Sequence, residues 1–126
     1  MPIVSTQPEL SPLRIDTVEN GELDQAIAMN LAVLAWSPLG GGRIGDPTNE
    51  REQNVAAALS GVAAAHGVSR TAAAYSWIMA HPARAIPIIG SQNSDRIREA
   101  ATAMNVRWTR TLWYDVLVAA RGEALP

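Results

Sequence analysis

Cysteine and lysine are both missing from this chain of 126 residues, whose ten basic residues are all arginine. Without cysteine the chain has no thiol nucleophile, no disulfide and no thiolate zinc site. The same absence is compatible with a reducing cytoplasm, the location that we expect. Without lysine, any mechanism that needs a lysine side chain is closed to this polypeptide.

A strong charge imbalance and a long apolar run are missing as well. The formal net charge is −2 and 17% of the residues are charged, so we expect no nucleic-acid partner. No apolar run approaches the roughly 20 residues of a membrane span, and no membrane partner is expected. The first residues show neither the basic segment nor the apolar stretch of a signal peptide. At this length, we expect one domain with a modest core.

Apolar segments alternate with amphipathic or alanine-rich segments along the chain, which is typical of an α/β fold. We predict a short strand near the amino end that is broken at Pro8, and strands in the runs LAVLAW and AIPIIG. Continuous apolar runs are typical of parallel strands covered on both faces. Helices are predicted at about residues 21–30, 49–66, 69–81 and 94–104, and from residue 109 onward. The result is three βα units and one extra helix.

A glycine-rich segment follows the second predicted strand. Residues 31–46, LAVLAWSPLGGGRIGD, contain the spacing G-x-G-x-x-G at Gly40, Gly42 and Gly45. In a Rossmann fold the strand leads at once into the glycines, and the third glycine opens a helix. Here residues 37–39 intervene and DPTNE follows the last glycine. The spacing therefore does not indicate a Rossmann fold, and a flexible glycine loop is the simpler interpretation.

The third predicted unit carries a stronger local signal, in IPIIGSQNSDRIREA. Gly90 and Ser91 stand at the carboxyl end of a strand, and Arg96 lies in the first turn of the next helix. Free backbone N–H groups and the positive end of a helix attract phosphate, and a guanidinium can bind two of its oxygens. Such a segment suits an anion site, but on the spacing alone an ordinary βα loop with a solvated arginine is the favoured interpretation.

Three segments together carry a family resemblance: AWSPLGGGR, IPIIGSQNSDRI and TRTLWYDVLVAARGEALP, in this order. They resemble the carboxyl-terminal half of an aldo-keto reductase of the bacterial YdhF-like type, and TQPELSPL is similar to the sixth barrel strand of that family. The resemblance implies that residues 1–126 form a partial TIM (β/α)8 barrel with strands six to eight and the closing helix. Such a chain would be incomplete alone, because a whole barrel takes about 250 residues.

The resemblance also implies that the cofactor is NADPH and that the glycine loop contacts it at the mouth of a barrel. Gln7 matches the residue that binds the nicotinamide carboxamide, and Trp36 stands where the family has a tyrosine stacked on the nicotinamide ring. A polar residue in a broken strand and a buried core tryptophan are the competing interpretations. The cofactor-binding positions implied are Gln7, Trp36, Ser37, Pro38, Leu39, Gly40, Gly41, Gly90, Ser91, Gln92, Arg96, Glu99 and Ala100.

At the adenosine end, Arg96 and Ser91 match the residues that hold the 2′-phosphate of NADPH, and Glu99 matches the residue that reaches the adenine. Two positions depart from the family pattern. Gly90 replaces a lysine and Ala100 replaces an asparagine, so one cation and one amide are missing from this end. A preference for NADPH over NADH is still the expectation.

Catalysis is expected to be absent from the chain alone. Family members transfer a hydride to a carbonyl carbon while a tyrosine, tuned by a lysine and an aspartate, protonates the oxygen and a histidine orients the substrate. The resemblance places those four residues in the missing first half, so no catalytic residue is assigned, and no metal site is expected. Tyr75 and Tyr114 are predicted to pack, while His66 and His81 stand at helix ends, where an imidazolium suits the helix dipole.

Three roles stay open: part of a reductase of aldehydes or ketones, a non-catalytic dinucleotide-binding module, and a self-associating remnant. Half a barrel leaves unpaired parallel edges near residues 3–7 and 86–89, and unpaired edges recruit strands. We therefore expect a homodimer, or the missing N-terminal half as a partner in trans. The inner sheet face should expose Val33, Ala35, Ile86 and Ile88, or their neighbours if the register is opposite.

Overall fold

Three short parallel strands form one sheet in the computed structural model, which describes residues 3–123. The strands are β1 (Ser5–Thr6), β2 (Ala32–Ala35) and β3 (Ile86–Pro87), in the order β1-β2-β3. Helical segments follow each strand, which confirms the α/β fold predicted from the alternating apolar runs. All three strands are shorter than predicted.

Most helices lie where the sequence pattern places them. They are α1 (Asp16–Glu19), α2 (Glu22–Ala28), α3 (Glu50–His66), α4 (Arg70–Ala80), α5 (Ser94–Ala101) and α6 (Arg110–Arg121). Side chains at the N-caps of α3 to α6 accept backbone N–H groups, and Gly67 ends α3 at a φ of 66°. The single turn α1 was not predicted. The predicted helix at 94–104 changes to a 3-10 turn at Thr102–Asn105.

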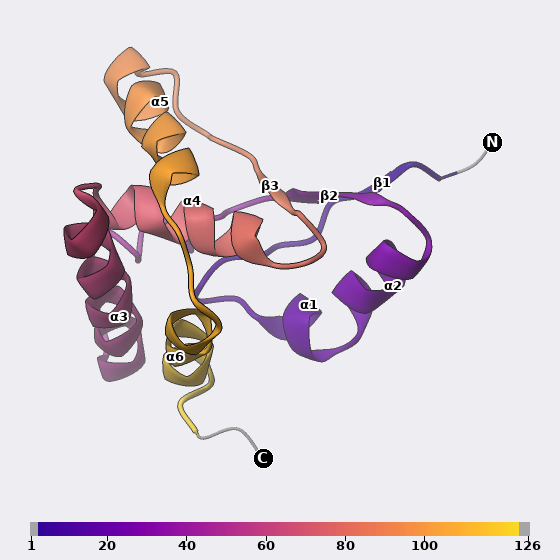
Figure 1. Ribbon diagram of the computed structural model, residues 1–126, viewed down its shortest axis with the longest axis horizontal. Helices are drawn as coiled ribbons and strands as arrows, with labels where there is room; N and C mark the ends of the chain where they lie inside the picture. Colours follow the sequence, from indigo (N-terminus) through magenta and orange to yellow (C-terminus); the bar gives the residue numbers. More distant parts are fainter. Residues whose placement is uncertain (1–2, 124–126) are drawn as a thin grey trace.

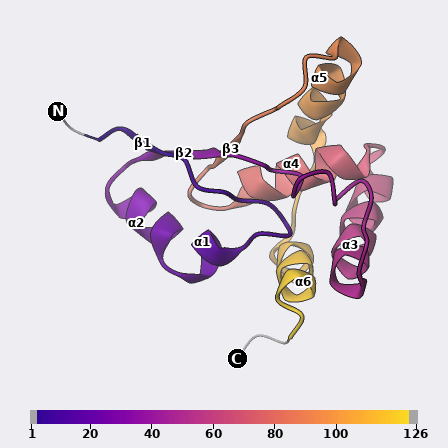
Figure 2. The same cartoon turned by 180° about the vertical axis from the view of Figure 1, so that it is seen from behind.

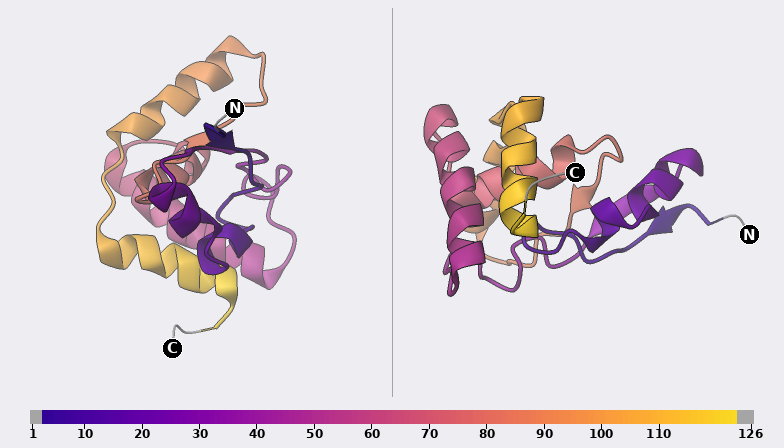
Figure 3. Two further views of the ribbon diagram at one scale, coloured as in Figure 1. Left: turned by 90° about the vertical axis from the view of Figure 1, so that its right-hand side faces the viewer. Right: turned by 90° about the horizontal axis from the view of Figure 1, so that it is seen from below.

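The helices lie in groups around α4. Figures 1 and 2 show α1 and α2 together on one side of the sheet, and Figure 1 places α5 and α6 on opposite sides of α4. Figure 3 shows α3 and α6 running side by side. One buried core joins α2, β2, α3, α4 and α6 through Leu23, Val33, Leu59, Trp77 and Val116, whereas α5 contributes no buried residue. The carboxyl ends of β2 and β3 point toward the loops that precede α3 and α5.

Only one face of β2 is covered. Val33 and Ala35 are buried against the helices, whereas Ala32 is exposed and Leu34 is half-buried on the opposite face. The prediction that Val33 and Ala35 would be exposed is therefore wrong, and the opposite register holds. A continuous apolar run does not reveal which of its residues face the helices.

The same bare face extends onto β3. Ile86 pairs with Leu34, and Ile86 and Ile88 keep 55% and 40% of their surfaces exposed, as predicted. Within residues 3–123, β1 and β3 pair with β2 alone, so each has an outer edge without a strand partner. The predicted open edges are thus confirmed for the described part of the chain.

Candidate functional site

Two loops at the carboxyl ends of β2 and β3 face each other across a cavity of about 840 Å³. One wall is the glycine loop, residues 37–49, which joins β2 to α3. The other is the segment that enters α5, and α4 closes the cavity between them. The residues that line it are Leu39, Gly42, Gly45, Thr71, Tyr75, Gly90, Ser91, Gln92, Asn93, Arg96 and Glu99.

Three consecutive glycines give the glycine loop its shape. Gly40, Gly41 and Gly42 have φ values of 64°, 68° and 89°, a region that side chains other than glycine rarely adopt. A Cβ on Gly40 would lie 2.9 Å from Leu13 Cδ1, whereas Gly41 and Gly42 face open space. The N–H groups of Gly41 and Gly42 have no hydrogen-bond acceptor within residues 3–123. The loop therefore presents backbone donors without covering them with side chains.

On the opposite wall, Asn93 caps α5. Its Oδ1 accepts the N–H groups of Asp95 at 2.9 Å and Arg96 at 3.4 Å, so these two helix donors are already satisfied. Ser91 Oγ accepts the Asn93 N–H at 3.1 Å, which leaves the Ser91 hydroxyl proton available. The anion site predicted here thus depends on the Arg96 guanidinium and the Ser91 hydroxyl more than on the helix terminus.

Tyr75 lines the cavity from α4 and was missed as a site residue. Only 6% of its surface is exposed, and burial, followed by the negative charge of Glu99, raises the pKa of its phenol. The hydroxyl therefore stays protonated at neutral pH and can donate. Thr71 lines the same cavity one turn earlier on α4. Their spacing of four residues on one helix face was the available signal.

Six of the predicted cofactor-binding residues line this cavity: Leu39, Gly90, Ser91, Gln92, Arg96 and Glu99. Gly40 and Ser37 are half-buried, Pro38 is buried and Gly41 is exposed in the same loop. Ala100 lines a separate apolar groove beside β3. Gly42, Gly45 and Asn93 line the cavity without having been predicted, and the first two belong to the G-x-G-x-x-G spacing.

Gln7 and Trp36 lie outside the cavity, on the bare sheet face. Trp36 is 48% exposed, so its interpretation as a buried core residue is wrong. The backbone N–H of Trp36 donates to the Pro8 carbonyl at 3.0 Å, and Pro8 directly follows the exposed Gln7. Both side chains therefore stand at the carboxyl end of the sheet, the end from which the two cavity loops leave.

The two histidines bind backbone groups. His66 Nδ1 donates to the Val62 carbonyl at 2.9 Å, and its Nε2 accepts the Arg107 N–H at 3.2 Å. His81 Nδ1 accepts the Ala83 N–H at 3.0 Å. Burial lowers the pKa of the His81 imidazole, and a ring nitrogen that accepts a hydrogen bond carries no proton, so the imidazolium suggested for the end of α4 does not fit this environment. In residues 3–123, no three histidine, aspartate or glutamate side chains gather as a metal site would require.

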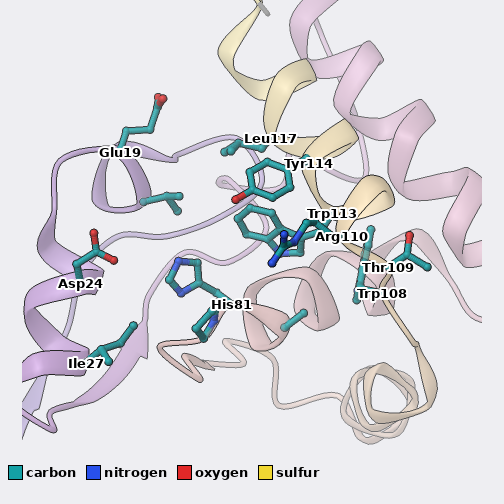
Figure 4. Close-up of a pocket in the computed structure, with 13 residues that line it drawn as sticks. Glu19, Asp24, Ile27, His81, Trp108, Thr109, Arg110, Trp113, Tyr114 and Leu117 are labelled. Atoms are coloured by element: carbon teal, nitrogen blue, oxygen red, sulfur yellow. The ribbon is translucent and has the colours of Figure 1, made fainter. Parts of the chain in front are cut away.

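A second cavity, of about 590 Å³, lies among residues that precede β2 and β3 and residues of α6. Figure 4 shows His81, Asp24, Trp113 and Tyr114 around it. Trp113 stacks on Trp77 with ring centroids 4.7 Å apart and an interplanar angle of 7°. None of the residues that line it also lines the cavity between the two loops, so the two cavities are separate.

Comparison with known proteins decides the family. A model described as "Aldo/keto reductase family" matches residues 1–114. The chain belongs to the aldo/keto reductase family. It is 64% identical over 124 residues to a 6-dehydroglucose reductase of Novosphingobium aromaticivorans, and 36% identical over 121 residues to a protein of that name from Agrobacterium fabrum. It is also 30% identical over 125 residues to the oxidoreductase YdhF of Escherichia coli.

These alignments cover 96–98% of this chain but only 40–41% of the relatives, so the chain spans about two fifths of their length. The fold also resembles that of Tm1743, a thermostable aldo-keto reductase solved with the inhibitor epalrestat. The TM-score is 0.76 at 22% sequence identity, over 94% of this chain and 40% of the other. Among the described residues, no helix is long and apolar enough to cross a membrane.

Proposed function

We propose that this chain is the dinucleotide-binding, C-terminal half of an aldo/keto reductase domain and that it binds NADPH between the two loops. In this proposal β1, β2 and β3 are strands six to eight of a partial TIM barrel. One observation carries it: Ser91 and Arg96, from the segment that enters α5 and from α5 itself, line one cavity together with Gly42 of the glycine loop, whose backbone N–H has no partner among the described residues.

The donor set fits the groups of a dinucleotide. Arg96 and Ser91 offer a guanidinium and a hydroxyl to a 2′-phosphate, and the N–H groups of Gly41 and Gly42 suit a pyrophosphate. Trp36 and Gln7, on the adjoining sheet face, offer a stacking surface and an amide to the nicotinamide end. The cavity of about 840 Å³ falls within the usual range of small-molecule sites, roughly 300–1,000 Å³.

The bound dinucleotide would supply a hydride to the carbonyl carbon of an aldehyde or ketone. Two relatives carry the name 6-dehydroglucose reductase, so 6-dehydroglucose is the first substrate that we propose for the complete enzyme. We expect no turnover by these 126 residues alone, because a positioned acid typically contributes 10²–10⁴-fold and no lysine exists to tune one. Rates above background that survive repurification would contradict this.

Arg96 provides the direct test of the cofactor assignment. A charge-assisted hydrogen bond pair to the 2′-phosphate is worth roughly 1.5–3 kcal/mol, so Arg96→Ala should weaken NADPH about tenfold or more and NADH little. Fluorescence titration measures both affinities. Arg98→Ala is the matched control, since Arg98 is an exposed arginine of the same helix that pairs with Asp95 at 3.6 Å. Equal losses for both cofactors would remove the assigned role.

The bare sheet face supports a second part of the proposal, an assembly. Leu34, Trp36, Ile86 and Ile88 leave apolar surface beside two open parallel edges, and such surface commonly marks an interface. We propose that a second copy of this chain, or the remaining part of the barrel as a separate chain, covers it. Sedimentation at micromolar concentration tests this. A compact, cooperatively folded monomer that binds no hydrophobic dye would contradict it.

A further inference from the structure

The glycine loop can offer its backbone donors only if its path is held. Gly40, Gly41 and Gly42 have left-handed backbones, and glycine loses more conformational freedom on ordering than any other residue. Within the loop, the Ile44 N–H donates to the Leu39 carbonyl at 3.2 Å. Two charged side chains, Glu52 of α3 and Arg70 of α4, also hydrogen-bond to the loop, and we call these two sets of contacts the first and the second tie.

The first tie is Glu52, which lies in the first turn of α3. Its side chain is buried, and only 1% of the residue's surface is exposed. Its Oε1 accepts the Thr48 N–H at 2.9 Å and the Thr48 hydroxyl at 2.8 Å. Its Oε2 accepts from Asn49 Nδ2 at 3.2 Å and from Arg43 Nη1 at 3.3 Å. All these donors lie at positions 43–49, so one carboxylate binds the second half of the loop.

These contacts also keep Glu52 charged. The two hydrogen bonds from Thr48 hold the pKa of the Glu52 carboxyl below its ordinary value, and the positive charges of Arg43 and Arg51 act in the same direction. Burial opposes them with a smaller effect than the Thr48 bonds. Charge-assisted bonds of this kind are roughly twice as strong as neutral ones.

The second tie is Arg70, the first residue of α4. Its Nη1 donates to the Ile44 carbonyl at 3.0 Å, and its Nε donates to Ser60 Oγ on α3 at 2.8 Å. The Ile44 side chain is itself buried. The loop is therefore anchored on both sides of Gly45, which lines the cavity.

We infer that Glu52 and Arg70 are positioning residues that hold the glycine loop in the conformation that binds the dinucleotide. The inference rests on the proposed function. Neither residue lines the cavity, so each acts through the loop. If the loop is already ordered before the ligand binds, binding does not carry the entropic cost of ordering it. Loss of either tie should then weaken binding at the loop more than binding at α5.

Glu52→Ala tests the first tie, with Glu50→Ala as the matched control, because Glu50 is an exposed glutamate of the same helical turn. The readouts are amide hydrogen exchange at residues 39–46 without ligand and the affinities for NADPH and for adenosine 2′,5′-bisphosphate. We expect faster exchange and an NADPH affinity about tenfold lower in Glu52→Ala, with the bisphosphate affinity changed less than twofold. Glu50→Ala should change none of these.

Two further variants separate positioning from folding. Glu52→Gln keeps one oxygen acceptor for Thr48 but turns an amide NH2 toward the donors of Asn49 and Arg43, so it should restore only part of the NADPH affinity. The remaining loss should still be larger for NADPH than for the bisphosphate, which a merely destabilising mutation would not show. Arg70→Met removes only the second tie and should reproduce the selective loss even if Glu52→Ala fails to fold.

Unchanged exchange at residues 39–46, or equal losses for NADPH and the bisphosphate, would overturn the inference. Failure of the unaltered chain to bind NADPH would instead overturn the proposed function, and the role of the ties in binding with it.

Discussion

Alanine at Gly40 and at Gly41 should give different losses of stability, although the two backbones are nearly alike. Both have φ near 65°, and an L side chain there costs about 1–2 kcal/mol. Alanine also lowers the conformational entropy of the unfolded chain, which offsets about 0.4–1 kcal/mol of this cost in each variant. Gly41→Ala meets no atom within 4 Å, so its net loss should be about 1 kcal/mol.

Gly40→Ala adds a collision. Its Cβ would lie 2.9 Å from Leu13 Cδ1 and 3.4 Å from Leu13 Cβ, and Leu13 is buried. Overpacking of this kind adds about 1–3 kcal/mol, so the total loss should be about 2–4 kcal/mol. The Leu13 side chain cannot rotate away freely, because it belongs to the main core.

Urea denaturation of the two variants and the parent chain measures the difference directly. Gly40→Ala should unfold at clearly lower urea concentration than Gly41→Ala, with similar slopes for all three proteins. Gly41→Ala should mainly weaken NADPH binding, since its methyl group would cover the open side of the loop. Equal stabilities of the two variants would refute the packing of Gly40 on Leu13, and with it the path of the loop described above.

Two other predictions concern the helical side of the molecule. Trp77→Phe removes an indole N–H that donates to the Trp113 carbonyl at 3.0 Å and leaves a gap in the stacked pair, so it should lower the free energy of unfolding by about 2 kcal/mol. Trp36→Phe, on the bare face, is the control and should change the free energy of unfolding by no more than about 0.5 kcal/mol. Equal losses in the two variants would contradict the stabilising role of the Trp77 indole. Burial lowers the pKa of His81, opposed by the charge of Asp24, so the unfolded chain takes up the proton first. Stability should therefore fall as the pH drops below about 6.5, and His81→Gln should remove that part of the fall in denaturation curves recorded between pH 7.5 and 5; an unchanged pH dependence in the variant would count against it.

The sequence by itself was sufficient for the features that depend on residues close to one another in the chain. Ser69 and Thr109 cap helices by accepting an N–H three residues ahead, and Gly67 ends α3 through its own backbone conformation. These interactions span only a few residues, so composition and spacing reveal them. The family resemblance likewise rests on short segments in a fixed order. For the same reason the sequence alone pairs Ser91 with Arg96, which stand five positions apart.

Only the tertiary structure decided which groups are free and which are already bonded. Whether Val33 or Leu34 faces the helices depends on the partners of β2, because a continuous apolar run carries no alternation to distinguish its faces. His66 accepts the backbone N–H of Arg107, 41 residues away, a contact that local spacing does not reveal. Tyr75 enters the site because α4 packs between two loops that are distant in sequence. Exposure, protonation and cavity walls arise from contacts between distant segments, and local spacing does not encode those contacts.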